Sequence, residues 1–258
     1  MDLFDYQMDE QLISEAPLAA RMRPQTLDDI AGQNHILGPG SLLRRAIQAD
    51  RLFSSIILYG PPGTGKTTLA RVIANTTQAH FENLSAVLAG VADLRKVIDA
   101  ATERRRLYRK RTILFIDEVH RWNKAQQDAL LSSVESGEII LIGATTENPS
   151  FEVIPALRSR ARVYVLKELN KKDLEKILDS ALKTDQFLSK LKINITDPDH
   201  LIFLSGGDAR LMISILESAV LHQSKNDEIV ISKDLLNKII QSKAVSYDKN
   251  GEEHYNVI

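Results

Sequence analysis

The residues with the clearest chemical meaning form one glycine-rich run, Gly60-Pro61-Pro62-Gly63-Thr64-Gly65-Lys66-Thr67. An apolar segment precedes the run, and a stretch with helical spacing that begins at Thr68 follows it. Glycines in this setting let backbone N–H groups turn towards phosphate oxygens, and the positive end of the next helix favours the same anion. Lys66 then reaches the β- and γ-phosphates, while the hydroxyl of Thr67 is a ligand for Mg²⁺. The run, together with Thr68, predicts a site for a nucleoside triphosphate with Mg²⁺.

Two carboxylates, Asp117 and Glu118, end the apolar segment 113–116. We expect Asp117 to hold Mg²⁺ together with Thr67, and Glu118 to polarise a water molecule for attack on the γ-phosphate. An enzyme that passed the phosphoryl group to a bound acceptor would not need this second carboxylate, so the pair favours an ATPase over a kinase. The alternative is that Glu118 only caps the turn that follows.

A threonine pair, Thr145 and Thr146, follows the apolar stretch 139–142. A hydroxyl at the end of a strand can orient the attacking water, and we choose Thr146 for this role. The alternative is that the pair only makes the hydrogen bonds of a turn.

Two arginines are candidates for control of the reaction. Arg160 stands just before the last expected strand, where it can complete the γ-phosphate site of a neighbouring subunit. Arg210 begins a helix in the second half of the chain, where it can report nucleotide state within its own chain. The alternatives are a surface ion pair for Arg160, with Arg158 and Arg162 as weaker finger candidates, and a plain surface charge for Arg210.

The only dense basic run is residues 103–111, which include Tyr108. We favour a solvated helix face for this run, and contact with a nucleic-acid backbone is the alternative. Trp122 is the sole tryptophan, and we favour packing or an interface for it over base stacking. His120 is two residues from Glu118 and is expected to be structural or a relay, not a metal ligand.

Composition narrows the class of protein. The chain has 258 residues, of which 43% are hydrophobic and 26% are charged, and this is the balance of a folded globular protein. It has 0 cysteines, which excludes disulfides, thiolate metal sites and cysteine nucleophiles. The formal net charge is −1, so any DNA contact has to be local. We expect a cytoplasmic protein that makes no membrane contact, because no apolar run is long enough to span a bilayer.

The elements that must position these residues can be read from apolar periodicity. Short buried segments alternate with helical stretches, which is typical of an α/β fold with a parallel sheet. The five expected strands are residues 55–59, 80–84, 112–117, 139–144 and 162–166. Strand signals fade after Lys167, and residues 171–182 and 208–221 have helical spacing.

We therefore expect four parts: a flexible arm (1–16), an α/β nucleotide-binding domain (17–167), a helical lid domain (168–241) and a linker (242–258). The linker is expected because residues 248–251 look like a turn.

Several longer strings identify a family. They are Pro17–Pro24 (PLAARMRP), Gly32–His35 (GQNH), Asp117–Arg121 (DEVHR), Gly143–Phe151 (GATTENPSF), Ser159–Tyr164 (SRARVY) and Tyr255-Asn256. Together with the glycine-rich loop they resemble the AAA+ ATPases of the clamp-loader branch. Within that branch they are most similar to the replication-associated recombination protein A family, also called RarA or MgsA.

The resemblance implies a fold and a set of site residues. The fold is an AAA+ P-loop domain with a five-stranded parallel sheet of order 5-1-4-3-2, followed by a small helical lid, with ATP or ADP held between them. The implied roles are Walker A for Lys66 and Thr67, Walker B for Asp117 and Glu118, sensor 1 for Thr146, arginine finger for Arg160 and sensor 2 for Arg210. Segments 18–24 and 30–32 correspond to the adenine pocket, which adds Arg21, Pro24, Ile30 and Ala31. Arg158 replaces a usually apolar residue, so either Arg158 or Arg160 is the finger.

The resemblance also implies a function. It is that of a DNA-dependent ATPase at stalled or damaged replication forks, whose hydrolysis of ATP remodels DNA or protein. The implied partners are single-stranded or fork-junction DNA, copies of the same chain in a tetramer, and replication proteins such as a single-stranded-DNA-binding protein. Family members continue past the equivalent of Ile258 into a helical domain used for tetramer formation, and the expected location is the cytoplasm, at the nucleoid. The alternative is an ATP-switched scaffold or clamp-loader-like subunit with little hydrolysis.

Overall fold

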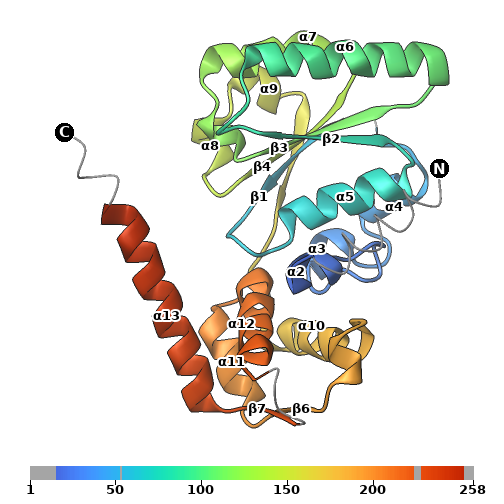
Figure 1. Ribbon diagram of the computed structural model, residues 1–258. Coiled ribbons are helices and arrows are strands. Elements are labelled where there is room, and N and C mark those ends of the chain that lie inside the picture. Colours follow the sequence, from blue (N-terminus) through green and yellow to red (C-terminus); the bar gives the residue numbers. More distant parts are fainter. Residues whose placement is uncertain (1–15, 53, 224–227, 253–258) are drawn as a thin grey trace, which may run out of the picture. The chain divides into compact units, whose positions relative to one another are not determined.

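The structure is a computed structural model that describes residues 16–52, 54–223 and 228–252, with only the backbone course given for 243–252 (Figure 1). The described residues form two units. Residues 24–169 form an α/β unit, and residues 16–23 join residues 170–252 in a helical unit.

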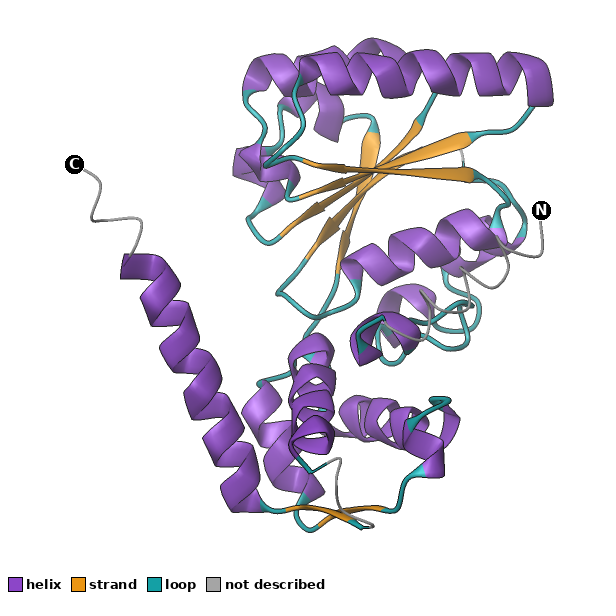
Figure 2. Ribbon diagram, viewed as in Figure 1, coloured by secondary structure: helices purple, strands orange, loops and turns teal. Residues whose placement is uncertain are grey.

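The α/β unit is built on one parallel sheet (Figure 2). Its strands are β1 (Ser55–Tyr59), β2 (His80–Ser85), β3 (Thr112–Asp117), β4 (Ile140–Thr145) and β5 (Ala161–Val165). Their order is β2-β3-β4-β1-β5, and every neighbouring pair is parallel. The fold class and the order 5-1-4-3-2 are confirmed, and the expected strand ends differ from the observed ones by one residue at most.

Both faces of the sheet are covered, which explains why successive residues in the middle of the central strands are apolar. Figure 1 shows α5 on one face and α6 and α7 on the other. Along β1 the buried side chains alternate: Ile56 and Leu58 belong to the core that includes α5, and Ile57 belongs to the core that includes α6 and α7. The helices of this unit are α3 (Asn34–Leu37), α4 (Leu42–Gln48), α5 (Lys66–Thr76), α6 (Val91–Tyr108), η1 (Val119–Arg121), α7 (Lys124–Glu135), α8 (Pro149–Glu152) and α9 (Pro155–Arg158).

The helical unit packs around α12, which contacts α10, α11 and α13. Buried leucine and isoleucine side chains from these helices form its core, among them Leu178, Leu201, Ile215 and Leu236. Its elements are α2 (Leu18–Arg21), α10 (Lys171–Thr184), η2 (Leu188–Lys190), β6 (Ile193–Ile195), α11 (Pro198–Ser205), α12 (Ala209–His222), β7 (Ile229–Ile231) and α13 (Lys233–Glu252).

The structure corrects the sequence prediction at two places in this unit. The strands β6 and β7 pair in parallel where only helices were expected, because three-residue strands are too short to show a two-residue period. Residues 242–252 continue α13 instead of forming a linker. Residues 233–250 include no proline, which is the residue that most strongly interrupts a helix. The rest of the expected linker, residues 253–258, and arm residues 1–15 lie outside the described residues.

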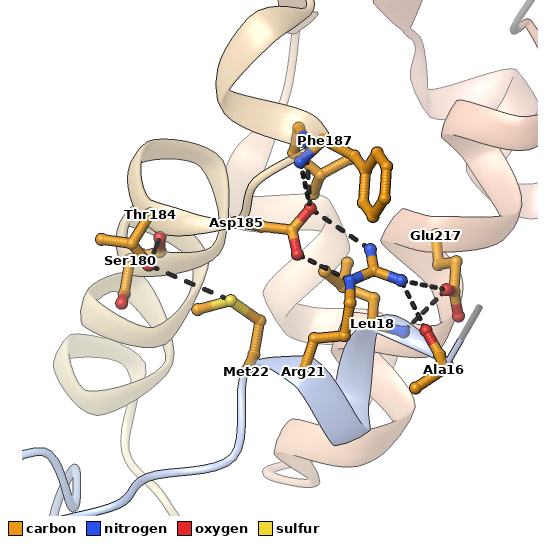
Figure 3. A network of polar contacts seen from close by, with 10 residues as sticks. Ala16, Leu18, Arg21, Met22, Ser180, Thr184, Asp185, Phe187 and Glu217 are labelled. Carbon is orange, nitrogen blue, oxygen red and sulfur yellow. Dashed lines mark hydrogen bonds and ion pairs between the residues drawn. The ribbon is translucent and has the colours of Figure 1, made fainter. Parts of the chain in front are cut away.

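One polar network fastens the segment before Pro24 to the helical unit (Figure 3). Arg21 donates from Nε to Oδ2 of Asp185 at 2.8 Å and from Nη2 to Oδ1 at 3.2 Å, and its guanidinium lies 5.0 Å from the ring centre of Phe187. The backbone N–H of Leu18 donates to Oε1 of Glu217 at 2.7 Å. These contacts explain why residues 16–23 group with the helical unit, whereas the sequence analysis placed residues 17–23 with the α/β domain.

The carboxylate of Asp185 is 1% exposed, and its pKa depends on opposing effects. Burial raises the pKa, but the hydrogen bonds from Arg21 and from the N–H groups of Leu188 and Phe187 lower it, and the net shift is downward. Asp185 therefore ionises at lower pH in the folded state than in the unfolded chain. The network stabilises the fold above the ordinary carboxyl pKa of about 4, and this contribution disappears as the pH falls through the lowered value.

We expect Asp185→Asn to lower the free energy of unfolding at pH 7 by about 3 kcal/mol, because it leaves a buried guanidinium without its carboxylate. Urea unfolding followed by circular dichroism at pH 7 and pH 3 measures the change. The wild type should lose stability over this pH range by more than the variant does. Asp179→Asn is the control. Asp179 pairs with Lys183 but is 66% exposed, so its substitution should lower the free energy of unfolding by less than about 0.5 kcal/mol. Equal losses in the two variants would contradict the burial argument.

Candidate functional site

The glycine-rich loop connects β1 to the amino end of α5, which begins at Lys66. Only glycine fits at position 60, because a Cβ there would lie 2.4 Å from the carbonyl oxygen of Leu166. Gly63 and Gly65 have φ of 70° and 93°, in the left-handed region that glycine adopts without strain. The Thr64 hydroxyl donates to the carbonyl of Pro61 at 2.9 Å and closes the turn. The unpaired N–H groups and the positive end of α5 therefore face the loop, which suits an anion.

Lys66 is folded back against this loop. Its ammonium group donates to the carbonyls of Gly60 at 2.7 Å and Pro61 at 2.8 Å, and the residue is only 8% exposed. A buried ammonium needs such partners, since burying an unpaired charge costs several kcal/mol (about 3–5). The positive charge is thus held at the loop by backbone carbonyls, and phosphate oxygens are natural competitors for it.

A buried glutamine braces the loop from the other side, and sequence reasoning missed this role. Gln33 donates to the carbonyls of Lys167 at 2.8 Å and Thr64 at 3.4 Å, and it accepts from the N–H of Lys167 at 3.0 Å. It is 6% exposed and has φ of 55°. The side chain connects the loop to the residue after Leu166, just past β5. The only sequence signal for it is its place in the string Gly32–His35.

The carboxylates, the threonine pair and the loop meet at one edge of the sheet. β4 lies between β1 and β3, so the residues that follow these three parallel strands are neighbours. The N–H of Gly60 donates to the carbonyl of Thr145 at 3.2 Å. Across the other strand boundary, the Thr146 hydroxyl lies 3.4 Å from Oε2 of Glu118.

Glu118 has a backbone conformation that is unusual for a residue other than glycine. Its φ of 54° and ψ of 49° place it in the left-handed region, directly after Asp117 ends β3. A non-glycine residue in this region costs about 1–3 kcal/mol, and such strain concentrates at functional sites. The turn directs the carboxylate of Glu118 towards Thr146.

The two threonines have different roles. Thr145 is fully buried, and its Oγ bonds both the N–H and the carbonyl of Glu147, at 3.0 and 3.2 Å. It makes the turn that the alternative interpretation anticipated. Thr146, the candidate chosen from the sequence, is the one whose hydroxyl reaches Glu118.

His120 lies beside Glu118, where a structural or relay role was expected for it. Its Nδ1 lies 3.0 Å from Oγ of Thr145 and 3.2 Å from Oε2 of Glu118. Nδ1 is thus hydrogen-bonded to the buried hydroxyl of Thr145, and it lies within ion-pair distance of the Glu118 carboxylate.

The two arginines near the last strand are bonded within their own unit. Nη2 of Arg160 lies 2.5 Å from Oε1 of Glu135, and its side chain is 41% exposed. Nη1 of Arg158 donates to the carbonyl of Ser150 at 2.6 Å. In this chain Arg160 thus makes the surface ion pair that was the alternative to a finger. Phe151, 84% exposed, follows Ser150 directly.

The remaining candidates divide between the units. Pro24, Ile30 and Ala31 are partly buried in the α/β unit. Arg210 is exposed at the start of α12 in the helical unit, and Arg21 of the same unit is engaged by Asp185.

The donor set near the loop fits Mg²⁺ held together with a nucleotide. Thr67 offers a hydroxyl at the start of α5 and Asp117 a carboxylate at the end of β3, and oxygen ligands of this kind suit a hard cation. Within residues 16–252, outside the gaps, no group of three or more histidine and carboxylate side chains forms a separate metal site.

Comparisons with known proteins agree with this geometry. Residues 56–169 match the family described as "ATPase family associated with various cellular activities (AAA)", and residues 188–258 match the "AAA C-terminal domain". This chain belongs to the AAA+ ATPases, in the replication-associated recombination protein A family. The family expected from the sequence is confirmed.

The relatives span more sequence than this chain. Replication-associated recombination protein A of Haemophilus influenzae is 46% identical over 94% of the chain and 55% of its own length, and the Escherichia coli K12 protein gives the same figures. The chain thus spans about half the length of the curated relatives it matches. Among solved structures, the Thermotoga maritima RuvB Holliday junction branch migration motor is 29% identical, with a TM-score of 0.66 over 86% of this chain and 72% of its own. No described helix is both long and apolar enough to cross a membrane.

Proposed function

We propose that this chain is the ATP-hydrolysing part of a DNA-dependent ATPase that acts in replication-associated recombination and repair, at stalled or damaged forks. The observation that carries the proposal is the contact between Glu118 and Thr146 at the sheet edge where the Lys66 loop lies. A base candidate, a polar orienting group and a phosphate-binding loop are the parts that hydrolysis of a γ-phosphate requires. The names of the relatives supply the link to replication and recombination.

In this proposal, the loop N–H groups and Lys66 bind the β- and γ-phosphates of ATP, with adenine against the segment around Pro24, Ile30 and Ala31. Mg²⁺, when bound to Thr67 and Asp117, neutralises phosphate charge. Glu118 accepts a proton from the attacking water, and Thr146 fixes the direction of that carboxylate. The lysine exchanges its contacts with the carbonyls of Gly60 and Pro61 for phosphate oxygens.

The same proposal gives His120 a positioning role. Its Nδ1 is hydrogen-bonded to the hydroxyl of the buried Thr145 and lies 3.2 Å from Oε2 of Glu118, where it holds that carboxylate in place. A fixed orientation matters because a general base works only within hydrogen-bond reach of the water. His120 therefore acts through Glu118 and does not itself touch the nucleotide.

Control of turnover is assigned to the arginines. Arg160 leaves Glu135 to reach the γ-phosphate site of a neighbouring copy, and Arg210 reports nucleotide state to the helical unit. Hydrolysis then depends on self-association, which we place in a tetramer of the full-length protein. DNA, as single strands or fork junctions, and a single-stranded-DNA-binding protein are the proposed partners, in the cytoplasm at the nucleoid.

A second candidate function has one observation in its favour. Arg160 is paired with Glu135 of its own chain, so this arginine is not free to reach a neighbour's γ-phosphate. That state fits an ATP-switched scaffold or a clamp-loader-like subunit that organises replication proteins with little hydrolysis.

Glu118→Gln should retain ATP binding and lower kcat by a factor of about 10²–10⁴, because the amide cannot accept the water proton. Titration with a fluorescent ATP analogue and a phosphate-release assay with and without DNA measure the two effects. The Lys66→Ala variant should lose ATP binding itself. Glu147→Gln is the matched control, since this exposed carboxylate follows Thr146 but makes no side-chain contact with it. Unchanged turnover in Glu118→Gln would contradict the mechanism, and a full cellular role without turnover would favour the scaffold.

His120→Ala should lower kcat by about tenfold with KM for ATP unchanged, whereas His120→Asn should recover most of the loss. Asparagine places an N–H donor where Nδ1 stands, so it can still direct Glu118. Steady-state kinetics on both variants give the comparison. A change confined to KM, or equal losses in the two variants, would assign His120 to packing alone.

Mixing variants of the full-length protein tests the arginine finger. Glu118→Gln and Arg160→Ala chains should each be nearly inactive, since a finger is worth about 10³–10⁵ in rate. Their mixture should regain turnover, because some interfaces then join an intact Glu118 to an intact Arg160. Phosphate release from the mixture is the measurement, and Arg158→Ala run in parallel is the control. If Arg158→Ala shows complementation and Arg160→Ala keeps full turnover, the finger is Arg158.

A further inference from the structure

The carboxyl end of α6 and the turn after it carry an unusual concentration of charge. Residues 103–111 hold six arginine or lysine side chains and one glutamate, in a chain whose formal net charge is −1. A run of this kind is often no more than a solvated helix end, and positive charge there also stabilises the helix dipole. The contacts of each cation separate these explanations.

Three of the six cations are used to hold the helix end in place. Arg104 bonds Glu82 and the hydroxyl of Thr112, and Arg105 bonds the carbonyl of Gly137. Arg111 pairs with Asp50. These side chains have structural roles in the α/β unit.

The other three cations point outward. Arg106, Arg109 and Lys110 are exposed, and within the described part of the chain their side chains make no hydrogen bond or ion pair. Tyr108 and Leu107 stand among them and are 74% and 55% exposed. We call these five residues, 106–110, the α6 basic surface. Arg106 in the last turn and Arg109 at the C-cap favour the helix dipole, but no packing contact accounts for free charges beside an exposed aromatic ring.

The α6 basic surface lies away from the nucleotide chemistry. α6 leads into the start of β3, whereas the Lys66 loop follows the end of β1 and Glu118 follows the end of β3. Because all five strands are parallel, these features belong to opposite edges of the sheet (Figure 1). Changes at residues 106–110 should therefore leave the ATP site intact.

We propose that the α6 basic surface binds the phosphate backbone of single-stranded nucleic acid. Arginine and lysine without protein partners gain from phosphate contacts through release of counterions, and an exposed tyrosine ring offers a face on which an unpaired base stacks. Three cations supply part of a binding site and not the whole of one. The inference rests on the proposed function, in which DNA is a partner. It adds a location for that partner, at the edge of the sheet where the strands begin.

Fluorescence anisotropy with a labelled DNA single strand, at several salt concentrations, tests the inference. Arg106→Gln/Arg109→Gln/Lys110→Gln should weaken binding by about tenfold or more and reduce the salt slope by about 2, because up to three phosphate contacts are lost. Tyr108→Ala should weaken single-strand binding more than duplex binding. The matched control, Lys172→Gln/Lys176→Gln/Lys192→Gln, removes the same charge from exposed positions of the helical unit and should change the affinity little.

The outcomes separate this inference from the proposed function. If the wild-type chain binds DNA and the triple variant binds with the same affinity and salt slope, the α6 basic surface is not the site although the proposed function stands. If both triple variants lose the same amount of DNA affinity, binding follows net charge alone and the inference is overturned. If the wild type binds no DNA, or binds only anionic vesicles, the inference and the DNA dependence of the proposed function both fail. Unchanged ATP affinity in the triple variant confirms that folding is intact.

Discussion

The position of β4 between β1 and β3 is the constraint on which the candidate site depends. Parallel strands end at the same edge, so this order alone places the glycine-rich loop, Glu118 and Thr146 beside one another although they are far apart in sequence. The apolar cores on both faces hold the three strands in register. An order that separated β3 from β4 would part Glu118 from Thr146, and one that separated β1 from β4 would move the glycine-rich loop away from both.

Most of the fold could be predicted because its central strands are buried on both faces and therefore appear as continuous apolar runs. The Lys66 loop was equally clear, since its glycines and flanking elements form a pattern with a known physical cause. The failures are of another kind. Strands β6 and β7 are too short for a period, and at the end of α13 a local turn signature was outweighed by the helix that precedes it. The local preference of a few residues is a weak guide to secondary structure wherever the neighbouring structure determines their conformation.

Within the site, the sequence identified side chains by type but not by partner. It favoured Thr146 over Thr145, yet only the contacts show that one threonine builds a turn and the other meets Glu118. The role of Gln33 could not be predicted, and for His120 the sequence indicated the neighbour Glu118 but not Thr145, because these contacts depend on atoms brought close by the fold and not by sequence spacing. The pairing of Arg160 with Glu135 is likewise visible only in three dimensions.

Gln33 has one more consequence, for communication along the backbone. A single amide group bonds both Thr64 in the loop and Lys167, and Lys167 precedes the boundary between the two units by only a few residues. Any displacement of the Thr64 carbonyl would therefore act on the same side chain that accepts from the N–H of Lys167. Hydrogen exchange at that N–H should then report on the conformation of the loop.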